Sequence, residues 1–402
     1  MNQLITFLQN IPEYKALVQG LEKDQSAAVT GIGQINRSHI LSALASRLNR
    51  PLVILCQDDM SAKRLQQELE AFTAKTFPIL PSRELTLYDN AVVSRAWEQT
   101  RLRQFYDLME GKTQVQIMSW DAFSQRTVPP TTLKEASFTL KMGQIYSVDT
   151  IISQLVSAGY SRCAMVEGPG QFALRGGILD IYSPVAEYPV RVEFFGDELD
   201  TMGYFDVDTQ RRTNNVEELV VLPVGESQAR LHPDGIDGLC QDIRSLLNSQ
   251  KRKKHPHEPL IKTLERDLEQ YENELHHSAS DRYMALIYPT FATALDYIPS
   301  NAVVVLCDHG SLHRTARQRV EQIGMELDGM LQNGLLAGEL CDFNLQWEDF
   351  CDRIQGRTVL YADTFGGSSY PEENPPKVLY PMTGKQLPSY GGSMDTAAAD
   401  LS

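Results

Sequence analysis

The first 136 residues alternate short, continuously apolar runs with stretches whose apolar residues recur at helical spacing. The runs SAAVTG (26–31) and PLVILC (51–56) are each predicted to form a buried strand. Between and after them, the apolar stripes within 40–48 and 62–72 predict amphipathic helices. Continuous apolar strands separated by such helices favour a parallel sheet that is covered on both faces.

The pattern changes between residues 137 and 226. One helix, predicted over 148–158, is followed by short strands in which polar and apolar residues alternate, separated by turn residues: FALRGGILDIY, YPVRVEFFG, ELDTMGYFD and VEELVVLP. This alternation favours an antiparallel sheet. Later residues return to the first pattern, with a long helix marked by Leu260 to Leu275, an apolar strand NAVVVLCD (301–308) and a helix over 311–329.

These patterns predict an α/β protein in which a split, P-loop-like parallel-sheet domain carries an inserted small α+β domain with an antiparallel sheet. Residues 1–136 would form the first part of the α/β domain, and residues 227–370 would complete it. Residues 137–226 would form the insertion. Residues 371–402, rich in Pro, Gly and Ser, are predicted to be a linker and the start of a further domain.

Composition narrows the possible functions. The 402 residues carry a net charge of −15, which disfavours broad, sequence-independent DNA binding, although the basic run KRKK (251–254) could touch nucleic acid if it is not simply a solvated loop. No run of 18 apolar residues and no signal peptide is present, so we expect a cytoplasmic protein without a membrane segment. The six cysteines lack a C-x-x-C pair and the histidines lack zinc-site spacing, so we expect reduced thiols and no metal site.

The stretch AVTGIGQI (28–35) follows a predicted strand and opens a predicted helix, as a phosphate-binding P-loop does. A P-loop needs a lysine and a hydroxyl after its last glycine, but Gln34 and Ile35 follow Gly33 here, and the first glycine position holds Ala28. Gly31 and Gly33 could still offer backbone N–H groups to an anion. The stretch is therefore either a degenerate nucleotide site or a plain strand-to-helix turn.

A second part of such a site is expected at the end of another buried strand. Asp308 ends the run VVVLCD, where an aspartate would help to hold Mg²⁺, but His309 stands where a water-activating glutamate would follow. The missing P-loop lysine, together with the missing hydroxyl ligand of Mg²⁺, would remove about 3–6 kcal/mol of nucleotide binding, or ~10²–10⁴ in affinity. We therefore expect no catalytic residue, no nucleotide cofactor and no metal in this chain.

The strand around residue 191 has an unusual outward face. Alternation places Val190, Val192 and Phe194 on one side, typical of a core. Arg191, Glu193 and Phe195 then share the other side, and Arg175 points away from the apolar residues of its own strand. Arginine and aromatic side chains are enriched at protein–protein interfaces. Alternatively, Arg191 and Glu193 pair with each other along the strand and Phe195 covers a secondary apolar cluster.

Three stretches carry a resemblance to a known family. Residues 168–211, GPGQFALRGGILDIYSP…YPVRVEFFGDELDTMGYFDVDTQR, closely resemble the domain shared by the excision-repair protein UvrB and the transcription-repair coupling factors (Mfd). TALDYIPSNAVVVLCDHG (293–310) resembles the UvrB segment with the Asp-Glu metal and water motif, and AVTGIGQI lies where UvrB has its P-loop. The resemblance covers most of residues 20–365 and implies a RecA/helicase-like fold for the α/β domain.

The departures from UvrB favour the coupling-factor branch. UvrB proteins carry a tyrosine-rich hairpin that wedges into damaged DNA, whereas residues 80–101 contain one tyrosine. A missing hairpin, lysine and glutamate together resemble the N-terminal region of the transcription-repair coupling factors. Residues 384–401, GKQLPSYGGSMDTAAADL, resemble the start of that family's next domain. The resemblance implies a fragment, with an RNA-polymerase-binding domain and a motor that uses ATP and Mg²⁺ to translocate on double-stranded DNA beyond residue 402.

The same resemblance implies that the inserted domain binds UvrA, the damage-sensing ATPase, through Arg175, Arg191, Glu193 and Phe195. Two alternatives remain open. The chain could be a UvrB-like ATPase that loads onto damaged DNA with an unusual nucleotide site, or an architectural domain that braces the motor without contacting UvrA. Binding of Mg-ATP would favour the first alternative, and co-purification with UvrA would exclude the second.

Overall fold

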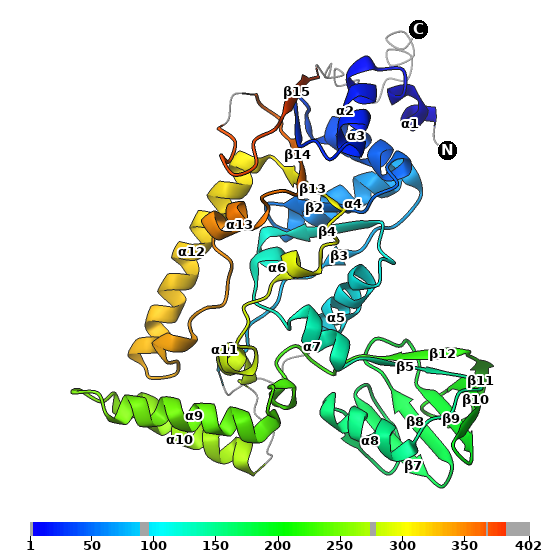
Figure 1. Ribbon diagram of the computed structural model, residues 1–402, viewed down its shortest axis with the longest axis vertical. Coiled ribbons are helices and arrows are strands. Elements are labelled where there is room, and N and C mark those ends of the chain that lie inside the picture. Colours follow the sequence, from blue (N-terminus) through cyan, green and yellow to red (C-terminus); the bar gives the residue numbers. More distant parts are fainter. Residues whose placement is uncertain (1–2, 89–95, 274–278, 367–368, 383–402) are drawn as a thin grey trace.

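A parallel sheet of seven strands forms the centre of the computed structural model, which describes residues 3–88, 96–273, 279–366 and 369–382 (Figure 1). The strand order is β15-β1-β14-β13-β2-β4-β3, and every neighbouring pair is parallel. The strands are β1 (Ala27–Thr30), β2 (Leu52–Cys56), β3 (Ile79–Leu80), β4 (Val115–Ser119), β13 (Val303–Cys307), β14 (Thr358–Ala362) and β15 (Val378–Pro381).

Helices cover both faces of this sheet because its strands are apolar on both sides. Ile54 and Val305 pack in the core on the side of the N-terminal helices, whereas Val53 and Val304 pack in the core on the opposite side. Helices of the first side are α1 (Gln3–Leu8), α2 (Pro12–Glu22), α3 (Gln34–Arg47) and α4 (Asp59–Thr73). Helices of the second side are α5 (Ala96–Met109), α6 (Trp120–Ser124), α7 (Pro130–Glu135), α12 (His309–Gln332) and α13 (Trp347–Arg353).

A separate domain is inserted between α7 and the later helices, and Figure 1 shows it in green at the lower right. Its six-stranded sheet has the order β11-β10-β9-β8-β7-β6 and is antiparallel except for the pair β6–β7. The strands are β6 (Ser161–Arg162), β7 (Gln171–Arg175), β8 (Ile178–Tyr182), β9 (Val190–Phe195), β10 (Glu198–Phe205) and β11 (Arg212–Asn215). Helix α8 (Val148–Ser157) packs on one face, and β5 (Phe138–Lys141) pairs with β12 (Glu218–Val221).

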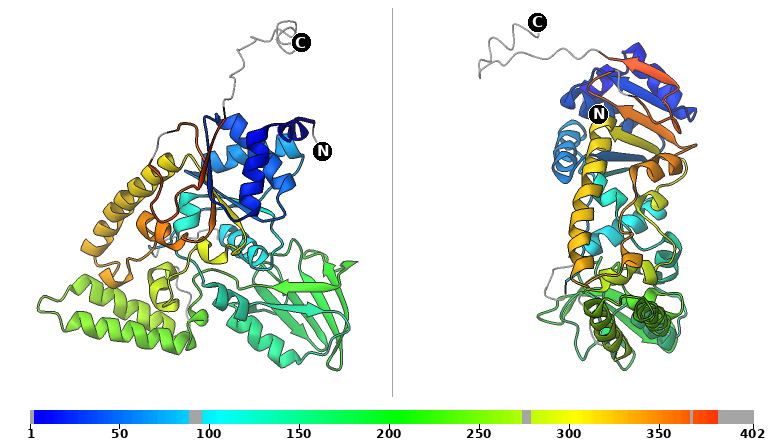
Figure 2. Two further views of the ribbon diagram at one scale, coloured as in Figure 1. Left: turned by 45° about the horizontal axis from the view of Figure 1, so that its top comes forward. Right: turned by 90° about the vertical axis from the view of Figure 1, so that its left-hand side faces the viewer.

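The chain leaves the insertion through an antiparallel helix pair, α9 (Gly235–Lys251) and α10 (Glu258–Glu272), which projects from the body in the left view of Figure 2. Of the basic run KRKK, Lys251 ends α9, and residues 252–254 lie in the connection to α10. The predicted helical position Leu275 lies outside the described residues. Short helices complete the fold: η1 (Ala229–Leu231), η2 (Ser280–Tyr283), α11 (Met284–Ile287), η3 (Ala294–Tyr297) and η4 (Gly338–Leu340).

The predicted fold class is confirmed: a parallel α/β domain carries a separate antiparallel unit, and the predicted strand at 301–308 rejoins the first sheet as β13, between β14 and β2. One prediction differs from the structure. Residues 378–381, expected in a linker, form β15 at the edge of the sheet and pair with β1. Among the described helices, none combines the length and apolar character needed to cross a membrane.

Candidate docking face and degenerate nucleotide site

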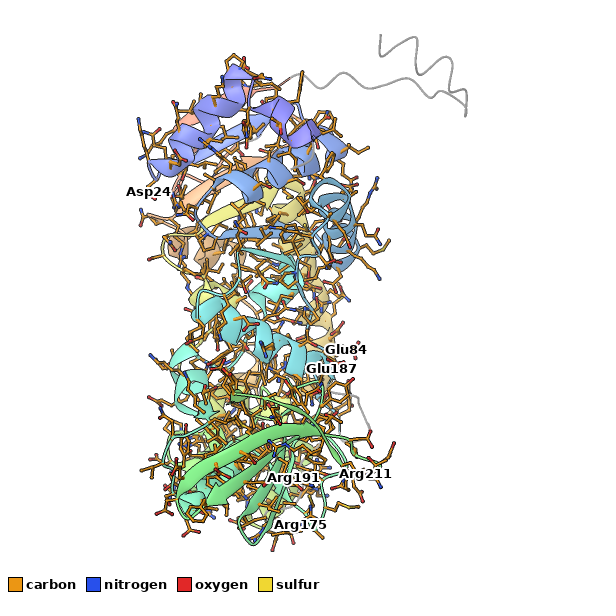
Figure 3. The ribbon with its side chains drawn as sticks, turned by 90° about the vertical axis from the view of Figure 1, so that its right-hand side faces the viewer. Asp24, Glu84, Arg175, Glu187, Arg191 and Arg211 are labelled. Atoms are coloured by element: carbon orange, nitrogen blue, oxygen red, sulfur yellow. The ribbon has the colours of Figure 1, made fainter. Side chains whose placement is uncertain are left out.

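The face of the inserted sheet that points away from α8 carries all four predicted binding residues. We define the outer face by the side chains that alternate with its core residues: Arg175, Ile178, Asp180, Arg191, Glu193 and Phe195. Cross-strand pairing places Asp180 opposite Arg191 and Ile178 opposite both Arg175 and Glu193. Figure 3 shows Arg175 and Arg191 on this sheet, at the opposite end of the molecule from α1–α3.

Asp180 organises the two arginines. Its side chain is fully buried and accepts hydrogen bonds from Arg175 Nη2 at 2.7 Å and from Arg191 Nε and Nη2 at 2.7 and 2.9 Å. The bidentate geometry of the Arg191 contact is among the strongest in proteins. The hydrogen bonds to Asp180 raise the pKa of Arg191. Because one carboxylate neutralises only one of the two guanidinium groups, a positive charge remains at this point of the outer face.

The two arginines differ in exposure. The Arg191 side chain is 16% exposed, lies 4.7 Å from the ring centre of Phe205, and donates a further hydrogen bond to the Gln210 carbonyl. The Arg175 side chain is 48% exposed. Arg191 is therefore mainly a structural residue of the outer face, whereas the Arg175 side chain is accessible to a partner.

Glu193 and Phe195 follow Arg191 on the same face. Glu193 forms an ion pair with Arg212 at 3.4 Å, so the alternative in which it pairs with Arg191 does not describe the structure. Phe195 is 81% exposed and ends β9 just before the turn at Gly196. It therefore covers no secondary apolar cluster, and its ring is free of the core.

Two apolar residues that the sequence reasoning missed extend this surface. Ile178 is partly exposed between Arg175 and Glu193, and Ile145 is 79% exposed. Ile145 forms a bridge with Glu198, which in turn pairs with Phe195. Both belong to the predicted insertion, but neither could be assigned to the outer face without the strand register.

The predicted nucleotide site is assembled from the expected elements but holds different contacts. Gly31 adopts φ +79° at the end of β1, and Gly33 precedes the first residue of α3. A side chain at position 31 would meet the carbonyl oxygen of Met382 at 2.5 Å, because the chain after β15 crosses this turn. Gln34 donates a hydrogen bond to Glu68 at 3.1 Å, and Ile35 is exposed to solvent.

Arg37 takes the place that a metal would need beside Asp308. One Asp308 oxygen is paired with the Arg37 guanidinium, and the other accepts the backbone N–H of Thr364 at 2.7 Å. Arg37 lies one turn inside α3, and sequence reasoning had no signal that joined it to a residue 271 positions later. Among the described residues, no cluster of three or more histidine, cysteine or carboxylate side chains could hold a metal ion.

His309 is a structural residue in this arrangement. Its ring Nδ1 lies 2.9 Å from Asp363 and its Nε2 3.2 Å from the Ser369 carbonyl, and the ring stacks on Tyr370. Burial lowers the pKa of His309, but the hydrogen bond to Asp363 and the charge of that carboxylate outweigh burial, so the net shift is upward. Because both ring nitrogens are engaged, neither is available to activate a water molecule.

Restoring the P-loop residue types should not restore nucleotide binding. In a Gln34→Lys, Ile35→Thr double variant, Arg37 would still neutralise Asp308 and the Met382 carbonyl would still cover Gly31. We expect neither the parent chain nor the variant to bind Mg-ATP more tightly than about 1 mM in isothermal titration. Micromolar binding by the parent would contradict this interpretation and favour a UvrB-like ATPase.

Comparison with known proteins shows which proteins this chain resembles. The sequence profile of the UvrB interaction domain family matches residues 138–226, which contain the whole outer face. The transcription-repair-coupling factor of Bacillus subtilis strain 168 is 26% identical over the whole chain. That of Staphylococcus aureus strain MRSA252 is 25% identical over 84% of the chain. Over its whole length the chain is therefore similar to transcription-repair-coupling factors, and residues 138–226 match the UvrB interaction domain.

The chain spans about a third of the length of these transcription-repair-coupling factors, namely 34% of the Bacillus protein and 29% of the Staphylococcus protein. The matched range, 138–226, begins one residue after the start of the insertion predicted over 137–226 and ends at the same residue. The roles of Arg175, Arg191, Glu193 and Phe195 in binding a partner stay predictions. The tyrosine-poor stretch within 80–101 is described only in part, because residues 89–95 lie outside the described residues.

Proposed function

We propose that this chain is the non-catalytic, UvrA-recruiting module of a transcription-repair-coupling factor. The observation that carries the proposal is the outer face, which lies inside the UvrB interaction domain and presents a half-exposed Arg175 and an exposed Phe195 on the same side of the sheet. A cationic and an aromatic side chain on a rigid sheet are typical of interface hot spots. We expect UvrA to offer a carboxylate to Arg175 and an apolar pocket to Phe195.

The charge distribution supports a specific contact over a general one. The outer face and its neighbour Arg212 combine three arginines with two carboxylates, in a chain whose net charge is −15. A small cationic area on an acidic molecule favours a partner with a complementary acidic patch and disfavours extended contact with the DNA backbone. UvrA would thus be the direct partner of this module.

The remaining activities of the family are proposed to lie outside this chain. We infer that the full protein couples RNA polymerase stalled at a lesion to excision repair, using a motor that hydrolyses ATP with Mg²⁺ and translocates on double-stranded DNA. In that arrangement this module needs no cofactor and catalyses no reaction. Its contribution is to bring UvrA to the stalled polymerase.

A direct binding measurement tests the proposal. The whole 402-residue chain is titrated into purified UvrA, with and without ATP, and complex formation is followed by calorimetry and co-purification. A saturable one-site complex is expected in at least one nucleotide state of UvrA. No binding in either state would overturn recruitment and favour an architectural domain, whereas ATP turnover by the chain alone would favour the UvrB-like ATPase.

A further inference from the structure

Two cysteines lie side by side at the carboxyl edge of the parallel sheet. Cys56 ends β2 and Cys307 ends β13. Leu55 is in register with Leu306, so the next opposed pair is Cys56 with Cys307, and both belong to the core on the side of α3 and α4. Cα atoms of opposed residues on neighbouring strands are about 4.8 Å apart, within the usual disulfide range of about 4.4–6.8 Å.

The pair faces a cavity instead of a closed core. A cavity of about 920 Å³ is lined by both cysteines together with residues of α3, α4 and the strand ends, including Arg37, Arg64 and Asp308. The two thiols influence each other's pKa, and the positive charge of Arg37 acts on Cys307. A small oxidant that enters the cavity would therefore lie against both cysteines.

The environment divides the two thiols into an attacking and a resolving group. The hydrogen bond from Cys56 lowers the pKa of Cys307, and the positive charge of Arg37 lowers it further against the opposing effect of burial. The same hydrogen bond, together with burial, raises the pKa of Cys56. At the other four cysteines, Cys163, Cys240, Cys341 and Cys351, burial raises the pKa.

We propose that Cys56 and Cys307 form a peroxide-sensitive dithiol that closes reversibly to a disulfide between β2 and β13. The Cys307 thiolate attacks one oxygen of hydrogen peroxide: an S–O bond forms, the O–O bond breaks, and hydroxide leaves and takes the Cys56 proton. The Cys56 thiolate then attacks the sulfenic sulfur: an S–S bond forms, the S–O bond breaks, and hydroxide leaves. With the proton that Cys307 released to solvent, two thiols and one peroxide yield one disulfide and two waters.

This inference does not depend on the docking proposal, because the dithiol lies in the α/β domain and the outer face lies in the insertion. To test it, the full chain is treated with increasing hydrogen peroxide, quenched with iodoacetamide, digested without reductant and analysed by mass spectrometry. A cross-linked peptide pair joining residues 56 and 307 is expected at lower peroxide than any change at the other four cysteines. Dithiothreitol should reverse it.

Variants test whether the cross-link depends on Cys307 and on the charge of Arg37, and not only on the closeness of the two cysteines. Cys307→Ser should abolish the cross-link, and Arg37→Gln should slow its formation severalfold, since the charge of Arg37 favours the Cys307 thiolate. Arg37→Lys, which keeps the charge, should retain the rate, and circular dichroism checks that each variant is folded. Arg64→Gln is the matched control from the same cavity and should react like the parent chain.

Three results would overturn the proposal. They are oxidation of Cys307 to a sulfinic acid with Cys56 left unmodified, equal reactivity of Cys163 or Cys341, and an unchanged rate in a folded Arg37→Gln variant.

Discussion

Replacing Phe195 by alanine is expected to weaken UvrA binding at least about thirtyfold while leaving the stability of the chain unchanged. Phe195 is 81% exposed, so its removal opens no cavity in the core. An aromatic anchor at the centre of an interface commonly contributes about 2 kcal/mol or more, which corresponds to a factor of about thirty in Kd. Calorimetry with UvrA measures the affinity, and thermal unfolding of the variant checks its stability.

The chain offers a matched control for this prediction. Phe365 is 80% exposed but lies after β14 in the α/β domain, far from the outer face. Phe365→Ala should bind UvrA like the parent chain. Equal binding by the Phe195→Ala and parent chains would remove Phe195 from the site, and equal loss in both variants would point to a general effect of surface hydrophobicity.

Arg191 is a less informative probe than Phe195, although the sequence pattern treated the two alike. Removing the Arg191 side chain would leave the buried Asp180 with Arg175 as its remaining ion-pair partner among the described contacts. Leaving a buried carboxylate poorly compensated destabilises the fold. Lost binding in Arg191→Ala would therefore mix a damaged sheet with a lost contact, whereas Phe195→Ala changes the surface alone.

The sequence predicted which residues share the outer face, but it did not predict that Asp180 holds Arg175 and Arg191 in place. Alternation in β9 correctly separated Val190 and Val192 from Arg191 and Phe195, because a half-buried strand has a strict period of two. Asp180 is part of the apolar strand ILDIY, and a lone carboxylate there was a signal that its partners would be charged. Which arginines pair with it depends on strand order and register, and these are set by tertiary packing.

The same limit explains the differences in the α/β domain. Strands β2 and β13 are continuous apolar runs, so composition alone predicts them. Strand β15 lies at an edge, is mostly exposed and follows the segment PEENPP, so its only strand signal is backbone pairing with β1. The ion pair of Arg37 with Asp308 likewise joins two residues that meet only because β1, β14 and β13 are neighbours.

Glu226→Ala is expected to lower the stability of the chain by about 3–5 kcal/mol, because it would remove the carboxylate that pairs with the buried Arg101 and leave the buried Arg83 with Asp281. Glu226 is the last residue of the UvrB interaction domain match and is fully buried. Its carboxylate lies 2.6 Å from Arg101 Nε and 3.9 Å from Arg83 Nη1, and it accepts a hydrogen bond from Thr127 Oγ1 at 2.6 Å. Both arginine side chains are also fully buried.

The measurement is thermal unfolding followed by circular dichroism, where a loss of this size should lower the midpoint by about 10 °C for a domain of this class. Asp107→Ala is the control, since it removes the partially exposed ion pair with Arg103 on α5, and its expected effect is below about 0.5 kcal/mol. An unchanged midpoint in Glu226→Ala would mean that water or a rearranged carboxylate compensates Arg101. A large loss would mean that the buried contacts of Glu226 with Arg101 and Thr127 stabilise the point where the insertion returns to the α/β domain.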